Sequence, residues 1–225
     1  MQRRNAYLTR ARISETRFRD FLRCFALDLT ATQAAELTGV HRNTANALYR
    51  RIRVRLAEAC EAESPLSGEV ELDESYFGPR RVPGRHGRGA GKKIIVFGLL
   101  KRHGKVYTQV VPNVRRKTLQ DIIQGRVELT STLYTDTYIS YHGLVDVGYA
   151  KHYRVQHDKN EFARGSSHIN GIESFWSFAK RRLQKFNGVA PHLFYLHLKE
   201  CEWRFNHRDQ DLYRELLKLL RAIPL

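Results

Sequence analysis

Residues 70–77 have the sequence Val-Glu-Leu-Asp-Glu-Ser-Tyr-Phe and are followed by Gly78-Pro79. Apolar and polar side chains alternate along this segment, which predicts a β-strand that ends where the Gly-Pro pair begins. Two more strands are expected at residues 93–100, where nearly every side chain is apolar, and at 106–111. Three consecutive strands ahead of helical segments indicate an α/β fold with a mixed sheet.

The rest of the chain after residue 111 alternates between helix and strand patterns before it becomes helical. A short helix is expected at 119–127, and further strands at 132–136 and 152–156. The helical segments that follow are expected at about 169–186, 191–206 and 209–221.

The charge of the chain points to a polyanionic partner. The 225 residues include 39 Lys and Arg against 23 Asp and Glu, a net charge of +16. A chain this basic favours nucleic acid as the partner, and the helix-turn-helix pattern at about 30–55 makes double-stranded DNA the expected one. A membrane is not expected, because no apolar run approaches the roughly 18 residues of a membrane span. The start of the chain resembles no secretory signal, so a cytoplasmic, nucleoid-associated location is expected. The three cysteines form no Cys-x-x-Cys pair, which excludes a zinc ribbon and favours buried thiols.

Residues 1–60 form a separate module by composition, with 12 Arg, no Lys and a helical pattern throughout. A helix-turn-helix is expected at about 30–55, with Thr32 as a cap and Gly39 in the turn. The side chains expected to contact DNA from its second helix are Arg42, Asn43, Thr44, Asn46 and Arg50. The alternative is an ordinary helical hairpin with a solvated basic face.

The chain is therefore expected to consist of an all-α module (1–60), a linker (61–68) and an α/β domain with a helical tail (69–225). The linker is indicated by small and polar residues together with Pro65 and Gly68.

Three acidic residues are candidates for catalysis. Asp73 lies in the first predicted strand, Asp136 ends the strand 132–136, and Glu173 lies early in an amphipathic helix. Three carboxylates that converge in a basic protein suit hard divalent ions, which activate a nucleophile and stabilise the leaving oxygen of a phosphodiester. Taken singly, each acid could equally be a solvated or ion-paired surface carboxylate.

Three sequence blocks resemble those of bacterial insertion-sequence transposases with an ISXO-like DDE domain. They are Glu-Leu-Asp-Glu-Ser-Tyr-Phe-Gly (71–78), Tyr-Thr-Asp-Thr-Tyr (134–138) and His-Ile-Asn-Gly-Ile-Glu-Ser-Phe-Trp-Ser-Phe-Ala-Lys (168–180). The resemblance covers roughly residues 65–207. It implies a ribonuclease-H-like fold, a mixed sheet flanked by helices.

The resemblance also implies the chemistry. Asp73, Asp136 and Glu173 would bind Mg²⁺, with Mn²⁺ able to substitute, and Lys180 would contact DNA near the cut. The reaction would be cleavage at terminal inverted repeats and transfer of the freed 3′-hydroxyl into target DNA, by a homodimer that holds two element ends. Some relatives carry Asn or His in place of the third acid, so Asn170 and His168 are alternatives to Glu173.

Further basic residues are expected to contact DNA. No acidic residue lies between Ser75 and Gln120, and a loop rich in Arg and Gly is expected to join the first two strands. The candidate DNA contacts outside the first module are Arg80, Arg81, Arg85, Arg88, Lys92, Arg181 and Arg182. Two other functions remain open: a nuclease on the same fold without strand transfer, and a non-catalytic DNA-binding repressor or decayed remnant.

Overall fold

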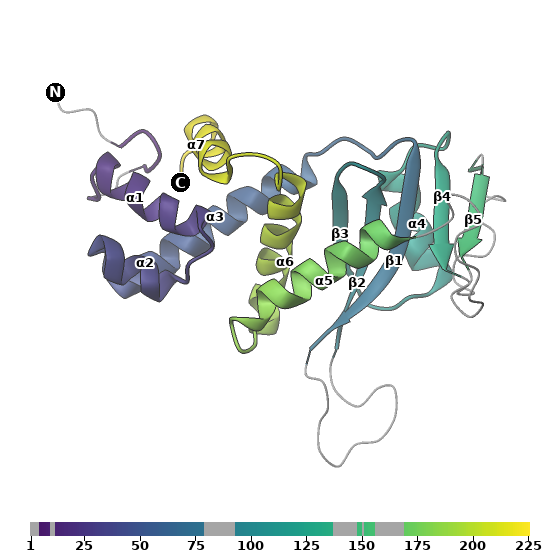
Figure 1. Ribbon diagram of the computed structural model, residues 1–225, viewed down its shortest axis with the longest axis horizontal. Helices are drawn as coiled ribbons and strands as arrows, with labels where there is room; N and C mark the ends of the chain where they lie inside the picture. Colours follow the sequence, from purple (N-terminus) through teal and green to yellow (C-terminus); the bar gives the residue numbers. More distant parts are fainter. Residues whose placement is uncertain (1–4, 10–11, 79–92, 137–147, 150, 156–168) are drawn as a thin grey trace, which may run out of the picture. The chain divides into compact units, whose positions relative to one another are not determined.

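The computed structural model describes residues 5–9, 12–78, 93–136, 148–149, 151–155 and 169–225. The chain forms two compact units, one of residues 1–62 with 207–225 and the other of residues 63–206 (Figure 1). Among the described residues, no helix is both long and apolar enough to cross a bilayer.

The first unit consists of the helices α1 (Glu15–Ala26), α2 (Ala31–Thr38), α3 (Arg42–Glu61) and α7 (Leu212–Ala222). Thr30, not the predicted Thr32, caps α2. Its hydroxyl accepts from the Gln33 N–H while the Gln33 side chain accepts from the Thr30 N–H, a reciprocal capping box that Thr32, inside the helix, is not placed to form. Gly39 ends α2 with φ = 64°, a left-handed conformation that glycine adopts without steric cost.

Helix α7 belongs to the first unit, whereas the α/β domain predicted from the sequence included residues 207–225. The backbone of Leu225 exchanges hydrogen bonds with Tyr7 and Thr9, and the Arg23 guanidinium lies 4.9 Å from the centre of the Tyr213 ring. The apolar face of α7, with Leu216 and Leu220 fully buried, is thus covered within the helical unit.

The second unit is built on a five-stranded mixed sheet (Figure 1). The strands are β1 (Glu69–Phe77), β2 (Ile94–Lys101), β3 (Val106–Val111), β4 (Thr132–Asp136) and β5 (Lys151–Val155), in the order β3-β2-β1-β4-β5. Strand β2 is antiparallel to β1 and β3, while β1, β4 and β5 run parallel. This order and these directions are those of the ribonuclease-H-like fold, as expected from the sequence.

Each face of the sheet has its own apolar core. Helix α4 (Arg116–Arg126) contributes Leu119 and Ile123 to the core that includes Leu72 of β1. Helix α5 (Asn170–Gln184) covers the other face with Ile172, Phe175 and Trp176. Since side chains alternate along a strand, the odd-numbered β1 residues 71, 73, 75 and 77 face α5.

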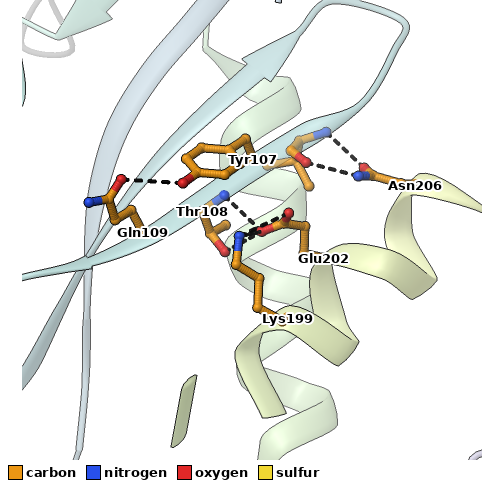
Figure 2. A network of polar contacts seen from close by, with 7 residues as sticks. Tyr107, Thr108, Gln109, Lys199, Glu202 and Asn206 are labelled. Carbon is orange, nitrogen blue, oxygen red and sulfur yellow. Dashed lines mark hydrogen bonds and ion pairs between the residues drawn. The ribbon is translucent and has the colours of Figure 1, made fainter. Parts of the chain in front are cut away.

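Helix α6 (Pro191–Asn206) is tied to β3 by buried polar contacts, which Figure 2 shows. The backbone N–H and the hydroxyl of Thr108 donate to Glu202 Oε2 at 2.8 and 2.6 Å, and Lys199 Nζ donates to the same oxygen at 3.0 Å. Asn206 pairs through its side-chain amide with both the N–H and the carbonyl of Val106. These contacts offset the cost of burying the Lys199–Glu202 pair.

Most predicted elements are confirmed with small changes at their ends. Strands β3 and β4 and helix α6 have the predicted bounds, whereas α4 begins three residues before the expected Leu119. Cys24, Cys60 and Cys201 are buried thiols, as expected.

Candidate active site

Strands β1 and β4 bring the first two candidate carboxylates to neighbouring positions. The strands are parallel, and Glu71 pairs with Tyr134. Two residues further along each strand lie Asp73 and Asp136. Since side chains two apart on a strand share a face, both aspartates lie on the face that α5 covers.

Asp73 is held in a partly buried position by α5. Its Oδ2 accepts a hydrogen bond from Trp176 Nε1 at 2.9 Å. Burial raises the pKa of Asp73 to about 7, and repulsion from Glu74 and Asp136 acts in the same direction, while the Trp176 hydrogen bond lowers it. Asp136 is therefore near enough to Asp73 for their charges to repel.

A glycine makes room for this hydrogen bond. Gly98 of β2 pairs with Asp73, and a Cβ atom at Gly98 would lie 2.6 Å from Cζ2 of Trp176 and 2.9 Å from Cδ1 of Ile172. Trp176 was not among the site residues predicted from the sequence. Gly98 could have indicated this contact from the sequence, because a glycine inside an apolar strand often marks the close approach of another group.

Glu173 lies in the first turn of α5 and is exposed, whereas its neighbour Ile172 is fully buried against the sheet. Among the described residues, no three His, Cys, Asp or Glu side chains are grouped closely enough to hold a metal ion. The expected convergence of three carboxylates is thus not present as a preformed cluster. The alternative Asn170 is the exposed first residue of α5, and His168 lies outside the described residues.

The Asp73–Asp136 pair fits a divalent cation by its chemistry. Carboxylate oxygens are the ligands that Mg²⁺ prefers, and its protein sites typically use few carboxylates together with water and substrate phosphates. Two carboxylates that repel each other in a partly buried position are stabilised by a bound cation.

Residues 65–206 match the sequence profile of the ISXO2-like transposase domain. The chain belongs to this transposase family. A relative is an uncharacterized transposase-like protein of Haemophilus influenzae, 49% identical over 116 residues that make up 52% of this chain and 93% of the relative. Another is an uncharacterized protein in the transposable element ISH50 of Halobacterium salinarum, 32% identical over 161 residues, which cover 64% of this chain and 54% of the relative.

Solved structures with weaker likeness include integrase and transposase cores. The catalytic core domain of BIV integrase has a TM-score of 0.41 and 15% identity, and the match covers 68% of this chain and 95% of that one. The catalytic domain of Mos1 transposase, solved with raltegravir and Mn, has a TM-score of 0.32 and 12% identity, with 76% and 92% covered.

In this ISXO2-like transposase, α5 carries three basic residues singled out in the sequence, and they differ in exposure. Lys180 and Arg181 are exposed, and Lys180 Nζ lies 5.7 Å from the centre of the Phe77 ring. Arg182 is buried; its guanidinium pairs with Glu200 and donates to Cys201 Sγ. Arg182 therefore binds within the protein, unlike its two exposed neighbours, and its contact with DNA stays a prediction. Arg80, Arg81, Arg85, Arg88 and Lys92 lie outside the described residues.

The candidate DNA contacts of the first unit lie on one helix. Ala45 and Leu48 of α3 are buried, while the five side chains predicted to contact DNA are exposed: Arg42, Asn43, Thr44, Asn46 and Arg50. His41 caps α3 by accepting from the Asn43 N–H through Nδ1 at 3.3 Å. The start of α3 thus presents polar and basic side chains to solvent.

Proposed function

We propose that this transposase-family chain is a DDE enzyme that cuts DNA at the inverted-repeat ends of its element and joins the freed 3′-hydroxyl to target DNA. The observation that carries the proposal is the position of Asp73 next to Asp136, on neighbouring parallel strands and the same face of the sheet. Family membership supports it, because the matched region spans both strands and α5.

The metal-binding residues in this proposal are Asp73, Asp136 and Glu173. When bound, two divalent ions, Mg²⁺ or in its place Mn²⁺, would lower the pKa of the attacking water or hydroxyl and would stabilise the leaving oxygen. Asp73 and Asp136 supply ligands from the rigid sheet, and Glu173 supplies the third from the adjoining helix. Glu173 is exposed, so its carboxylate is open to solvent on the side from which ions and DNA would approach.

DNA is held by exposed basic groups of both units. The start of α3 acts as the recognition helix of a helix-turn-helix, where side chains meet base edges in the major groove. Lys180, seven residues or about two turns after Glu173, lies on the same side of α5 and contacts a phosphate near the cut. A homodimer holds the two element ends together.

The test is a cleavage and joining assay with end-labelled DNA that carries the inverted repeats flanking this reading frame. Asp73→Asn keeps an acceptor for Trp176 but removes the charged ligand, so we expect cleavage to fall at least 1,000-fold (about 4 kcal/mol of barrier) while DNA binding is unchanged. Asp121→Asn, an exposed residue of α4 on the opposite face, is the matched control and should retain wild-type activity.

Three outcomes would contradict the proposal. Unaltered cleavage by Asp73→Asn would remove this residue from the site. Cleavage by the wild type without joined products would indicate a nuclease instead of a transposase, and DNA binding with no Mg²⁺- or Mn²⁺-dependent cleavage would indicate a repressor.

A further inference from the structure

Helix α5 begins without a cap from its own sequence. Its N-cap residue is Ile169, whose side chain has no atom that can accept a hydrogen bond. The N–H of Ile172, the third residue of the helix, donates instead to Oε2 of Glu71 at 2.9 Å. Glu71 of strand β1 therefore caps the helix, a role usually filled by a Ser or Asp side chain next to the first turn. Its negative charge at the helix N-terminus is also favourable.

The approach of Glu71 to the helix depends on a glycine. A Cβ atom at Gly171 would lie 2.9 Å from Glu71 Oε2 and 2.9 Å from Cδ2 of Leu100. Real Cβ atoms do not approach that closely, so a larger residue at this position would displace the carboxylate. Glu71 itself is only 1% exposed, which leaves it little space to move.

The second oxygen of Glu71 connects the helix to β4. Arg102 Nε donates to Glu71 Oε1 at 3.1 Å, and the Arg102 guanidinium lies 3.6 Å from the centre of the Tyr134 ring. The Tyr134 hydroxyl donates to Glu69 at 2.7 Å. Since Tyr134 lies two residues before Asp136, one buried carboxylate is linked to all three elements that carry the candidate metal ligands.

A second contact holds α5 to β1 one helical turn further on. Ile172 donates a hydrogen bond to Glu71, and Trp176, one turn later on the helix, donates to Asp73, two residues later on the strand. Glu173 lies between these two contacts along α5. Its backbone position relative to Asp73 is therefore fixed, although its side chain is exposed.

We propose that Glu71 is a positioning residue for catalysis: by capping α5 and binding Arg102, it sets the place of Glu173 relative to Asp73 and Asp136. This inference rests on the proposed function, since it assigns Glu173 a role in binding divalent metal. Glu71 does not itself contact metal or DNA; it acts through the helix.

The test compares Glu71→Gln with Glu202→Gln in the full-length protein. Both residues are buried carboxylates of the same unit, each with a cationic and a backbone N–H partner. Glu202, which also accepts from the Thr108 hydroxyl, joins α6 to β3. Mn²⁺ binding is measured without DNA by the electron paramagnetic resonance signal of free Mn²⁺, and the half-saturating Mn²⁺ concentration is measured for cleavage. Thermal unfolding reports stability.

We expect Glu71→Gln to raise the half-saturating Mn²⁺ concentration for cleavage, and the dissociation constant, about tenfold. Glu202→Gln should lower the unfolding temperature at least as much and leave both Mn²⁺ values within twofold of wild type. In a Glu173→Gln background, Glu71→Gln should have no further effect on the Mn²⁺ dissociation constant, because Glu71 acts through Glu173.

Gly171→Ala provides a second variant if Glu71→Gln does not fold. It leaves the charge of Glu71 intact and should raise the Mn²⁺ requirement in the same way. The inference would be overturned if Glu71→Gln and Gly171→Ala both kept the wild-type Mn²⁺ dissociation constant and half-saturating concentration. Equal changes of these values in Glu71→Gln and Glu202→Gln would also overturn it. A wild-type protein that neither binds Mn²⁺ nor cuts DNA would instead overturn the proposed function.

Discussion

The indole N–H of Trp176 donates a hydrogen bond to Oδ2 of Asp73 across the interface between α5 and the sheet, with the two heavy atoms 2.9 Å apart. The indole reaches the carboxylate because the residue paired with Asp73 on β2 is Gly98, which has no side chain to block it. The contact favours the charged form of Asp73, while burial favours the neutral form. The hydrogen bond from Trp176 therefore orients the Asp73 carboxylate before any ligand binds.

Gly98→Ala should displace Trp176 from Asp73. The new methyl would lie 2.6 Å from Cζ2 of Trp176, and the cost of this overpacking is about 1–3 kcal/mol. We expect a loss of that size in the free energy of unfolding, measured with urea, and a fall in cleavage rate of at least tenfold. Gly125→Ala is the control, because a Cβ there has open space in α4 and should leave both values near wild type. Equal stabilities and cleavage rates in the two variants would contradict the role of Gly98 in making room for Trp176.

The stability of the metal-free protein should depend on the ionisation of Asp73. Its pKa in the folded protein is about 7, against an ordinary value of 3.8, so between these pH values the folded state binds the extra proton. The free energy of unfolding should therefore fall as the pH rises from about 4 to about 7, since stability rises with pH only where the unfolded state binds more protons. In EDTA, Asp73→Asn should gain stability relative to wild type over this range, reaching about 2–4 kcal/mol at pH 8. A difference that does not vary with pH would contradict the raised pKa.

Lys199→Met should destabilise the protein by about 3–5 kcal/mol, because it leaves Glu202 buried without its ion-pair partner. The neutral form of Glu202 becomes more favourable in this variant, so the loss should be smaller at pH 5 than at pH 8. Lys218→Met removes an exposed lysine that pairs with Glu215 on α7 and should change stability by less than about 1 kcal/mol. Urea unfolding of the three proteins at both pH values tests this expectation, and equal losses in the two variants would refute it.

Arg50→Ala should weaken DNA binding in a salt-dependent way. An arginine that neutralises one phosphate contributes about one unit to the slope of log K against log salt concentration, so the slope should decrease by about one unit. The control is Arg214→Ala, an exposed arginine of α7 that pairs with Asp211. Fluorescence anisotropy with a labelled duplex at several salt concentrations measures both. An unchanged slope in Arg50→Ala would place the DNA contact elsewhere.

Local sequence patterns predicted most of the fold. Alternation in residues 70–77 and the apolar run at 93–100 gave β1 and β2 within a residue, because the period of two belongs to the strand itself. Gly39 likewise predicted the turn between α2 and α3. Long-range packing was not predicted: α7 is amphipathic, and nothing local in the pattern of such a helix specifies which unit covers its apolar face.

The sequence by itself determined the strands, the helices and the basic charge, since each depends on local periodicity or on composition. The resemblance of three sequence blocks to a transposase family identified the candidate carboxylates. The tertiary structure decided what surrounds them. It placed Asp136 beside Asp73, left Glu173 exposed, buried Arg182 against Glu200 and put Glu71 at the start of α5. These relationships join residues up to 101 positions apart, and burial and hydrogen bonding between such residues arise only when the sheet and its helices pack together.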